Sequence, residues 1–343
     1  MAVGRRKRRS GAGGSGVVLL ILVLAVASGW YGLLPLQPSA PTFVDIAPGT
    51  SASHIGAQLE SAGIIRSRWA FLAVRLLRHR RLNAGEYRFE KSATVVDVYD
   101  RIARGDVYTV VVTIPEGWTR HEIAARLEQV GLGTAEGFLD ATVTDVAQIH
   151  DLDPQAVNLE GYLFPDTYHF RRHATEVQLV DAMVHRFRVE ARQLNLSVHV
   201  HDVVTLASLV EKETAVPQER PLVASVLLNR LARGMPLMTD PAVIYGLHEQ
   251  GKWRGTIYAS DLSDPARDTP YNTYRHTGLP PGPIANPGTA SLRAAMHPAV
   301  TNYLYFVAAG SDPQGHSLFA STLQQHQRNV ALYRKAKQQA GGQ

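Results

Sequence analysis

The sequence predicts an α+β protein with a single N-terminal transmembrane helix, a small domain and a larger mixed domain. An apolar run without charges at residues 17–34 indicates the helix. From residue 43 onward, short β-prone segments alternate with apolar residues at helical spacing, a pattern typical of α+β domains. Of the 343 residues, roughly 300 follow the apolar run, which is enough for two domains of ~150 residues.

The apolar run is long enough to span a membrane. It has 18 residues and contains Trp30 and Tyr31 near its end, and such side chains gather at membrane interfaces. The expected N-terminal segments are a basic cytoplasmic tail at 1–16, a transmembrane helix at 17–36 and a linker at 37–42. The alternative is a cleaved signal peptide, because residues 25–27 read Ala-Val-Ala. The anchor is favoured because the apolar run continues past that site.

The charge is concentrated before the apolar run. Five basic residues at 5–9 account for the whole formal net charge of +5, so the rest of the chain is formally neutral. This distribution predicts a cytoplasmic N-terminus and an exported body. It argues against nucleic acid as a partner, because a nucleic-acid binder carries its basic surface on the folded part. The chain has no cysteine, which excludes disulfides, thiolate catalysis and Cys-ligated zinc.

A weak internal repeat opens the folded part. Residues 49–64 align with 117–132 at six of sixteen positions, and each copy follows a β-prone segment and a Gly turn. Ser51 and Thr119 are expected to cap the two helices. This strand, turn and capped helix unit resembles the unit of LysM-like glycan-binding modules, which implies a LysM-like domain at 43–110. A plain spacer domain is the alternative.

The rest of the chain, residues 111–337, is expected to form the larger α+β domain. Its segment 303–308 reads as a buried strand and 323–339 as an amphipathic helix. Several enzyme signatures are incomplete in this part. The P-loop-like segment at 246–252 is followed by Trp253 instead of Ser or Thr, and Ala125 stands where a zincin needs its second His. No metal site and no cofactor is implied.

The segment 203–233 carries the best candidates for chemistry. Asp202 is expected to cap a helix whose apolar stripe is flanked by Glu211 on one side and Glu213 on the other, each about 80° away. A carboxyl at the edge of an apolar stripe is partly desolvated, which raises its pKa and suits a general acid. The alternative is a pair of structural glutamates in ion pairs with Lys212 or Arg220. Spacing alone does not choose between these.

Several longer motifs resemble one family. They are LASLVEKETAVPQERPLVASVLLNRL, MTDPAVIYGL, PYNTYRHTGLPPGPIANPG and the upstream LEGYLFPDTYHF. Together they look like the YceG-like family of endolytic murein transglycosylases, over residues 110–335. The resemblance implies cleavage of the β-1,4 bond between MurNAc and GlcNAc, in which the C6 hydroxyl of MurNAc attacks C1 and leaves a 1,6-anhydro end. It also implies an inner-membrane protein with periplasmic domains and peptidoglycan synthases as partners.

The resemblance also implies roles for particular residues. Glu211 matches the family's catalytic residue, and Glu213 a second motif position that orients the site, binds substrate or forms an ion pair. Asp240, Asn272 and Tyr274 are candidates for holding the sugar. Glu160 and Asp166 form a competing acid pair suited to substrate contact, for which a buried structural Glu and an N-capping Asp are the alternative. Tyr245 is expected in the core.

Two further functions remain open on the sequence. One is a non-catalytic peptidoglycan-binding scaffold, and the other is an ordinary muramidase that uses water as the nucleophile. The intact VEKET segment at 210–214 weighs against the scaffold. The end that is released would separate the lyase, which leaves an anhydro end, from the hydrolase, which leaves a reducing end.

Overall fold

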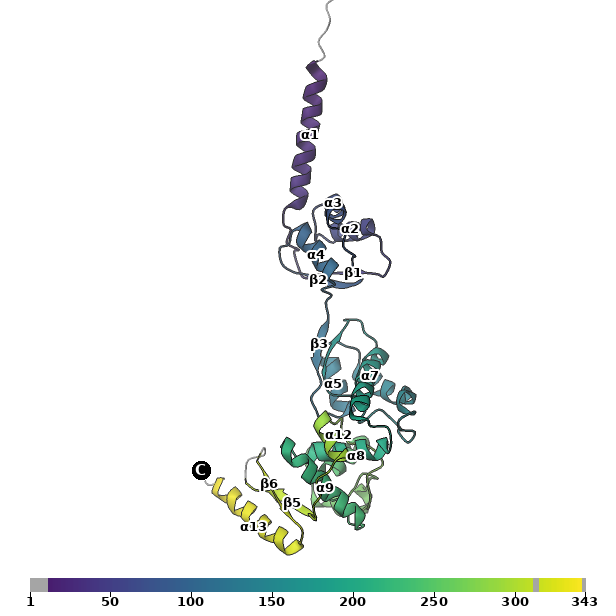
Figure 1. Cartoon of the computed structure of the whole chain (residues 1–343), viewed down its shortest axis with the longest axis vertical. Helices are drawn as coiled ribbons and strands as arrows, with labels where there is room; N and C mark the ends of the chain where they lie inside the picture. Colours follow the sequence, from purple (N-terminus) through teal and green to yellow (C-terminus); the bar gives the residue numbers. More distant parts are fainter. Residues whose placement is uncertain (1–11, 311–314, 341–343) are drawn as a thin grey trace, which may run out of the picture. The chain divides into compact units, whose positions relative to one another are not determined.

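The computed structural model describes residues 12–310 and 315–340 (Figure 1). The chain divides into two compact units, Met1–Thr109 and Val110–Gln343. This division falls one residue before the boundary expected from the sequence. The basic cluster at 5–9 lies outside the described residues, so its predicted cytoplasmic location stays a prediction.

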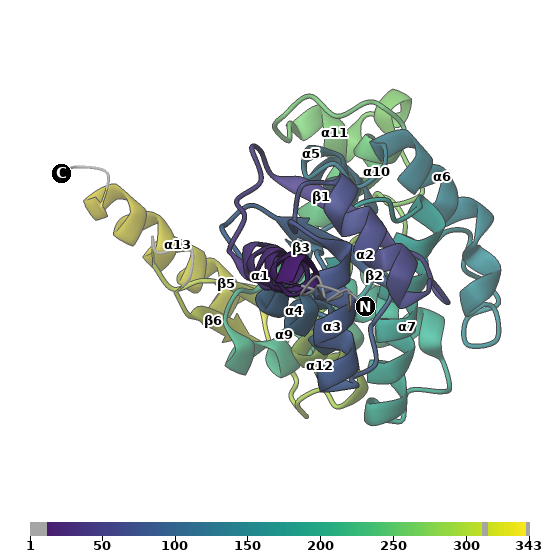
Figure 2. The ribbon, with the colours of Figure 1, turned by 90° about the horizontal axis from the view of Figure 1, so that it is seen from above.

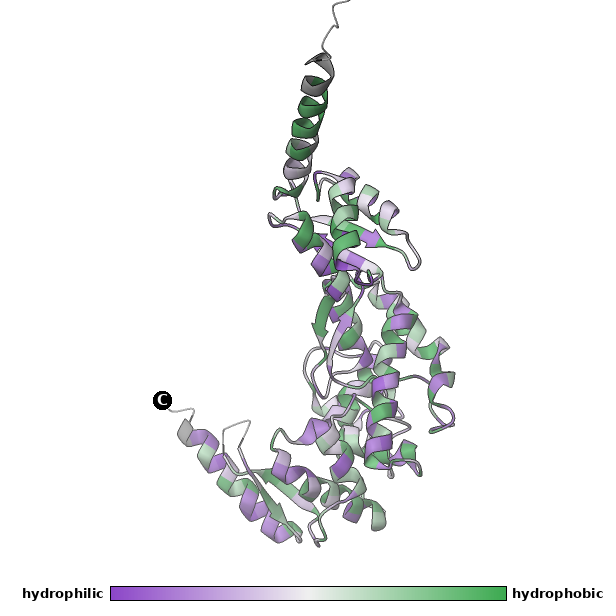
Figure 3. Cartoon of the chain, turned by 45° about the horizontal axis from the view of Figure 1, so that its top comes forward, coloured by the Kyte–Doolittle hydropathy of each residue, from purple (hydrophilic) through white to green (hydrophobic). Residues whose placement is uncertain are grey.

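The first unit begins with a long apolar helix, α1 (Ala12–Leu33). Its side chains Val17 to Leu24 and Trp30 are more than half exposed, and Figure 3 shows the hydrophobic turns along the helix. Within residues 12–310 and 315–340, no helix is long and apolar enough to cross a membrane. The transmembrane helix expected at 17–36 is therefore not confirmed.

The folded part of the first unit consists of three helices and a two-stranded antiparallel sheet. Strand β1 (Thr42–Ile46) pairs antiparallel with β2 (Gly85–Phe89). The helices are α2 (Ala52–Ser61), α3 (Arg68–Arg78) and α4 (Val95–Arg104). Ile55 and Leu59 of α2 are buried in this core together with Phe71, Tyr87 and Tyr99. Removing these side chains from water supplies most of the unit's stability.

The second unit is mixed but mostly helical. Strands β3 (Val110–Thr113) and β4 (Thr167–Phe170) pair antiparallel. The helices are α5 (Arg120–Gln129), α6 (Ala135–Thr144), α7 (Glu176–Leu194), α8 (Val200–Glu213), α9 (Arg220–Ala232), α10 (Asp240–Glu249), α11 (Ala259–Ser263), α12 (Thr289–Met296) and α13 (Leu323–Ala340), with short 3₁₀ turns at Val146–Ile149, Pro217–Glu219 and Pro265–Arg267. Helix α8 is the central element, because α9, α10 and α12 all contact it.

The two copies of the internal repeat fall in different units. Ser51 accepts a hydrogen bond from the His54 amide at 3.3 Å, and Thr119 forms a capping box with Glu122, so both predicted caps are confirmed. Each turn glycine, Gly49 and Gly117, adopts a positive φ, which Gly reaches without steric cost. The repeat therefore opens each unit with the same local structure.

Two local expectations in the larger unit need correction. Helix α8 begins at Val200 with His199 at its N-cap in the left-handed region, so Asp202 lies in the first turn and is not the cap. The expected strand near 303–308 is β5 (Tyr305–Ala308), which pairs with β6 (Ser317–Ala320). Its four residues are only partly buried. The two-stranded sheet packs against α13, seen beside it in Figure 2, and β5 also contacts α9.

Candidate active site

Glu211 and Glu213 lie in the last turn of α8, where this helix leaves the core. Val204, Ala207 and Val210 of this helix are completely buried, which fixes the rotation of the helix about its axis. The helix ends because Thr214 turns to extended backbone. Glu211 and Glu213 consequently face two different groups of partners, as the helical spacing predicts.

Glu211 accepts a hydrogen bond on each of its two carboxylate oxygens. Its side chain is only 5% exposed, and Arg220 Nη2 donates to Oε1 at 2.8 Å. The backbone N–H of Gly288 donates to Oε2 at 3.0 Å. Gly288 is the N-cap of α12, so the positive end of that helix dipole also favours a negative charge here. Each carboxylate oxygen therefore has its own donor.

Glu116 completes this group. Burial and repulsion from Glu211 raise the pKa of Glu116, and Arg220 opposes the shift from 3.6 Å. A Cβ atom on Gly288 would lie 1.8 Å from Glu116 Oε1, so the close approach of Glu116 depends on glycine there. Gly117 packs its Cα against Glu211, where an added Cβ would lie 3.3 Å from Cγ. The turn of the second repeat copy is therefore part of the site.

Glu213 has a different environment. Its side chain forms no hydrogen bond and no ion pair with any residue in the described part of the chain, and the residue is partly exposed. Burial, together with repulsion from Asp240, raises the pKa of Glu213 to about 7, although Arg230 acts in the opposite direction. Glu213 therefore exchanges a proton near neutral pH, which is the property required of a general acid.

Asp240 and Tyr274 lie on the side of α8 that Glu213 faces. The Tyr274 hydroxyl donates to Asp240 Oδ1 at 2.6 Å, and burial together with this hydrogen bond raises the pKa of Tyr274. Arg230 is held by the carbonyls of Leu237 and Leu304, each at 2.7 Å, and its charge acts on Glu213. These four side chains, Glu213, Arg230, Asp240 and Tyr274, form what we call the acid cluster.

Asn272 supports the acid cluster from behind. Its side chain is fully buried, and its Nδ2 donates to the carbonyls of Asp261 and Leu262 at 3.3 Å. Its Oδ1 accepts the backbone N–H of Tyr274 at 3.1 Å. All its polar atoms are engaged, so the structure does not support the expectation that Asn272 contacts the sugar. It positions Tyr274 instead.

Glu160 is also structural in this arrangement. It is 1% exposed and accepts hydrogen bonds from the Arg120 amide at 3.0 Å and from Asn286 Nδ2 at 2.8 Å. Burial raises its pKa to about 8, although the Arg120 hydrogen bond opposes the shift. A side chain this deep does not reach a polysaccharide, so direct substrate contact by Glu160 is not supported. Tyr245 lies in the core, as expected, and Asp166 pairs with Arg186 at 2.7 Å.

The loop before α12 is fastened at two points. Asn286 Oδ1 accepts the Leu163 amide at 2.9 Å, in addition to the contact with Glu160. In the first turn of α8, His201 Nδ1 lies 2.8 Å from Asp153 Oδ2 and its Nε2 lies 3.1 Å from the Pro281 carbonyl oxygen. Both imidazole nitrogens donate only when the ring is protonated. The hydrogen bond with Asp153 raises the pKa of His201, which favours that form.

Comparison with known proteins agrees with the motifs. A family model described as the YceG-like family matches residues 44–332. The chain belongs to this family. The match covers most of both units, and it confirms the resemblance that the sequence motifs indicated.

Three relatives of the YceG-like family illustrate the similarity. The chain is 32% identical to an endolytic murein transglycosylase of Bacillus subtilis strain 168 over 334 residues, 89% of each protein. It is 32% identical to a protein of the same name from Streptococcus pneumoniae R6, over 93% of this chain but only 65% of the relative, so it spans less than two thirds of that protein. A crystal structure of a YceG-like protein from Listeria monocytogenes aligns with a TM-score of 0.54 and 30% identity, over 84% of this chain and 98% of that one.

Several residues around the two glutamates had no assigned role in the sequence analysis. Arg220 entered only as a possible ion-pair partner, Arg230 and Gly288 lie in the matched motifs without a role, and Glu116 was not considered. Gly288 is separated from Glu211 by 77 residues, and no local pattern links the two. The one signal in the sequence was Gly117, which the internal repeat singled out.

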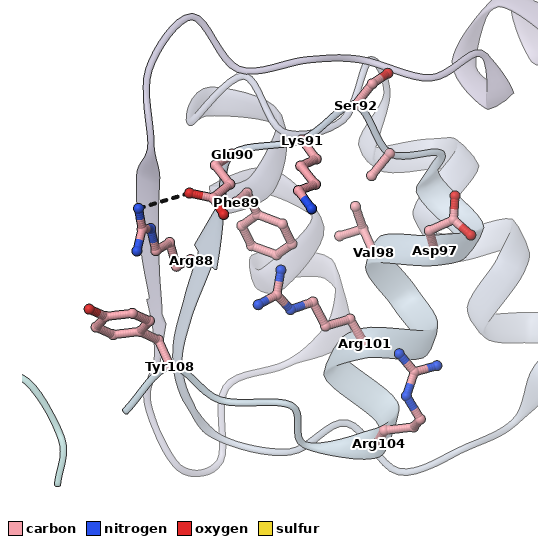
Figure 4. A pocket seen from close by; sticks show the side chains of 11 residues that line it. Arg88, Phe89, Glu90, Lys91, Ser92, Asp97, Val98, Arg101, Arg104 and Tyr108 are labelled. Atoms are coloured by element: carbon pink, nitrogen blue, oxygen red, sulfur yellow. Dashed lines mark ion pairs between the residues drawn. The ribbon is translucent and has the colours of Figure 1, made fainter. Parts of the chain in front are cut away.

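The first unit has a separate polar pocket of about 520 Å³ between β2 and α4 (Figure 4). Arg88 is engaged by Glu90 at 2.8 Å. Lys91 and Arg101 extend into the pocket beside Phe89, and the Arg101 guanidinium stacks over the Phe89 ring at 5.3 Å. The pocket therefore offers positive charge and an aromatic surface to a ligand.

We expect Arg220→Met to lower the free energy of unfolding by about 3–5 kcal/mol, because it leaves the buried Glu211 charge without its partner. Adding Glu211→Gln should recover part of this loss. Arg188→Met is the matched control: its partner Asp151 is 58% exposed, so the loss should be under about 1 kcal/mol. Urea denaturation of these three variants and of the unmodified protein measures the losses. Equal losses for Arg220→Met and Arg188→Met would contradict the conclusion that Arg220 neutralises a buried Glu211 charge.

The hydrogen bonds by which His201 holds the loop before α12 should depend on pH. Because the folded-state pKa of His201 is raised, its contribution is complete below its unfolded pKa of about 6.5 and is lost as the pH rises through the folded value. His201→Gln should therefore lower the unfolding midpoint more at pH 6 than at pH 9, two test values on either side of that range. Denaturation curves at both pH values, with exposed His54→Gln as control, measure the difference. An equal change in the unfolding midpoint at both pH values would contradict a contribution from protonated His201.

Proposed function

We propose that the protein is an endolytic lytic transglycosylase of peptidoglycan, and that Glu213 is its proton donor. The observation that carries the proposal is the environment of Glu213: a carboxyl without a neutralising partner in the described chain, with its pKa raised to about 7 beside a Tyr–Asp pair. The names of the relatives support the substrate and the reaction class.

The reaction needs one group that is first an acid and then a base. Protonated Glu213 donates its proton to the bridging oxygen as the bond to C1 of MurNAc breaks. The C6 hydroxyl of the same sugar then attacks C1, and the Glu213 carboxylate accepts its proton. The proton is thus returned, and the products are a free GlcNAc hydroxyl and a 1,6-anhydro end. No water enters, so a second carboxylate to activate water is not required.

The other side chains of the acid cluster have supporting roles in this scheme. Asp240 raises the pKa of Glu213 and offers a negative charge to the oxocarbenium-like transition state. Tyr274 holds Asp240 in place through its hydroxyl. The family resemblance implies Glu211 as the acid, whereas in this structure both of its carboxylate oxygens already accept a hydrogen bond, from Arg220 and from the Gly288 N–H. We assign Glu211 a positioning role, in which it joins α8 to α9 and α12.

Matched variants decide between the two glutamates. Glu213→Gln should lower turnover by about 10²–10⁴-fold or more, because a general acid contributes at least this much. Glu211→Gln should remain more active and keep the same pH profile, in which activity falls as the pH rises through about 7. Mass spectrometry of muropeptides released from purified peptidoglycan measures both. If Glu211→Gln alone abolishes activity and stays folded, Glu211 is the acid.

The same products separate the alternatives. Anhydro ends support the lyase, and reducing ends would make the protein a muramidase. Retained binding without products in the unmodified protein would make it a scaffold. In the proposed role the enzyme cuts nascent strands and thereby limits their length, next to the synthases that extend them.

The proposal includes the location of the protein and a role for the small unit. The uncharged run at 17–34 and the exposed apolar side chains of α1 support an anchor in the inner membrane, with both units in the periplasm. The strand and helix arrangement of the small unit, with its pocket at Lys91 and Arg101, supports a LysM-like role in binding wall glycan.

The anchor predicts an intact N-terminus in membranes. Fractionation of cells followed by mass spectrometry should detect peptides from before residue 25 in the membrane fraction. A mature protein that begins at Ser28 would show instead that the segment is a cleaved signal.

A further inference from the structure

Helix α3 has two apolar faces, and only one of them is covered. Phe71 and Val74 are buried in the core of the first unit. Trp69, Leu76 and Leu77 are 67%, 70% and 81% exposed. At 100° per residue, Trp69 and Leu76 lie about 20° apart on a helical wheel, while Phe71 lies about 160° from Trp69. A surface helix normally places polar side chains on the face opposite its core, so this outer face lacks its partner.

The outer face is surrounded by positive charge. Between Ser61 and Gly85 there is no Asp or Glu, whereas arginines stand at 66, 68, 75, 78, 80 and 81. Arg78 pairs with Asp100. Arg68 has a distant contact with Glu60 at 4.0 Å, and its guanidinium also lies over the Trp69 ring at 5.1 Å. The side chains of Arg80 and Arg81 form no hydrogen bond or ion pair within the described chain. Much of this charge is therefore available to a partner.

Helix α3 adjoins the end of α1. Arg66 Nη1 donates to the Tyr31 hydroxyl at 2.8 Å, and its guanidinium stacks on the Tyr31 ring at 4.7 Å. A Cβ atom on Gly32 would lie 3.1 Å from Ala70 Cβ, so the two helices approach closely there. The exposed face of α3 thus belongs to the same unit as the apolar surface of α1 and begins near its end.

We propose that the outer face of α3 binds the surface of an anionic phospholipid bilayer. Trp69, Leu76 and Leu77 enter the interface between headgroups and acyl chains, and the arginines bind lipid phosphates. An aromatic and aliphatic face bordered by basic residues is the arrangement that lies in a membrane surface. An acidic glycan would engage the arginines but leave the three apolar side chains in water. A second copy would bring two sets of arginines together.

The contact would act in addition to α1. It holds the small unit against the bilayer and so limits the orientations that this unit adopts. The contact goes beyond the proposed enzymatic function and does not depend on which glutamate is the acid.

The absence of cysteine allows a direct test on the full chain. Leu77→Cys provides a single site for an environment-sensitive fluorophore, and its exposure means that the fold tolerates the change. The labelled protein is reconstituted in phosphatidylcholine vesicles with or without phosphatidylglycerol. Because α1 is present in both samples, a difference in fluorescence between them reports a change around residue 77 on α3. We expect a blue shift, and quenching by bilayer-embedded spin labels, only with phosphatidylglycerol.

Matched variants complete the test. A fluorophore at Val157→Cys, which is 75% exposed in the other unit, should not respond. The double variant Arg80→Glu/Arg81→Glu should lose most of the response, and added salt should weaken it. Turnover of soluble glycan fragments should not change, which separates this surface from the active site.

Three results would overturn the proposal. The first is a fluorophore that stays in water with both lipids. The second is a response in detergent that rises with protein concentration, which would indicate a second copy. The third is a response to soluble peptidoglycan fragments without lipid, which would indicate an acidic glycan.

Discussion

The carboxylate of Glu211 is the point on which the larger unit depends. It receives one hydrogen bond from Arg220 at the start of α9 and one from Gly288 at the start of α12. Three helices are therefore joined by a single buried charge. Such a pair is stable only if every lone pair is satisfied, because the desolvation of the ions offsets much of their attraction. The close approaches of Gly117 and Gly288 make this geometry possible.

The role of Glu213 follows from that of Glu211. The buried face of α8 sets the rotation of its last turn, so that Glu211 faces Arg220 and Gly288 and Glu213, two residues on, faces the opposite group of side chains. There it meets the Asp240 carboxylate instead of a donor, and burial together with this repulsion raises the pKa of Glu213 to about 7. One helix end thus presents two identical side chains in different surroundings: Glu211 meets two hydrogen-bond donors, and Glu213 meets a second carboxyl group.

The loop before α12 connects this chemistry to the rest of the unit. Glu160 and Asn286 hold it through buried hydrogen bonds, and His201 holds the Pro281 carbonyl at its other end. None of these side chains needs to touch a substrate to matter. They keep the Gly288 N–H aimed at Glu211, and this explains why polar groups from the motifs at 159–170 and 280–288 lie in the interior.

The amino-acid sequence by itself determined the family, the α+β class, the caps of the repeated helices and the segment that carries the chemistry, because these depend on neighbours within a few turns. It did not determine which donors and charges surround Glu211 and Glu213. Those outcomes depend on Arg220, Asp240 and Gly288, which lie 9 to 77 residues from the glutamates along the chain. The protonation of a carboxyl is set by the charges and donors around it in space, and only the tertiary structure decides which those are.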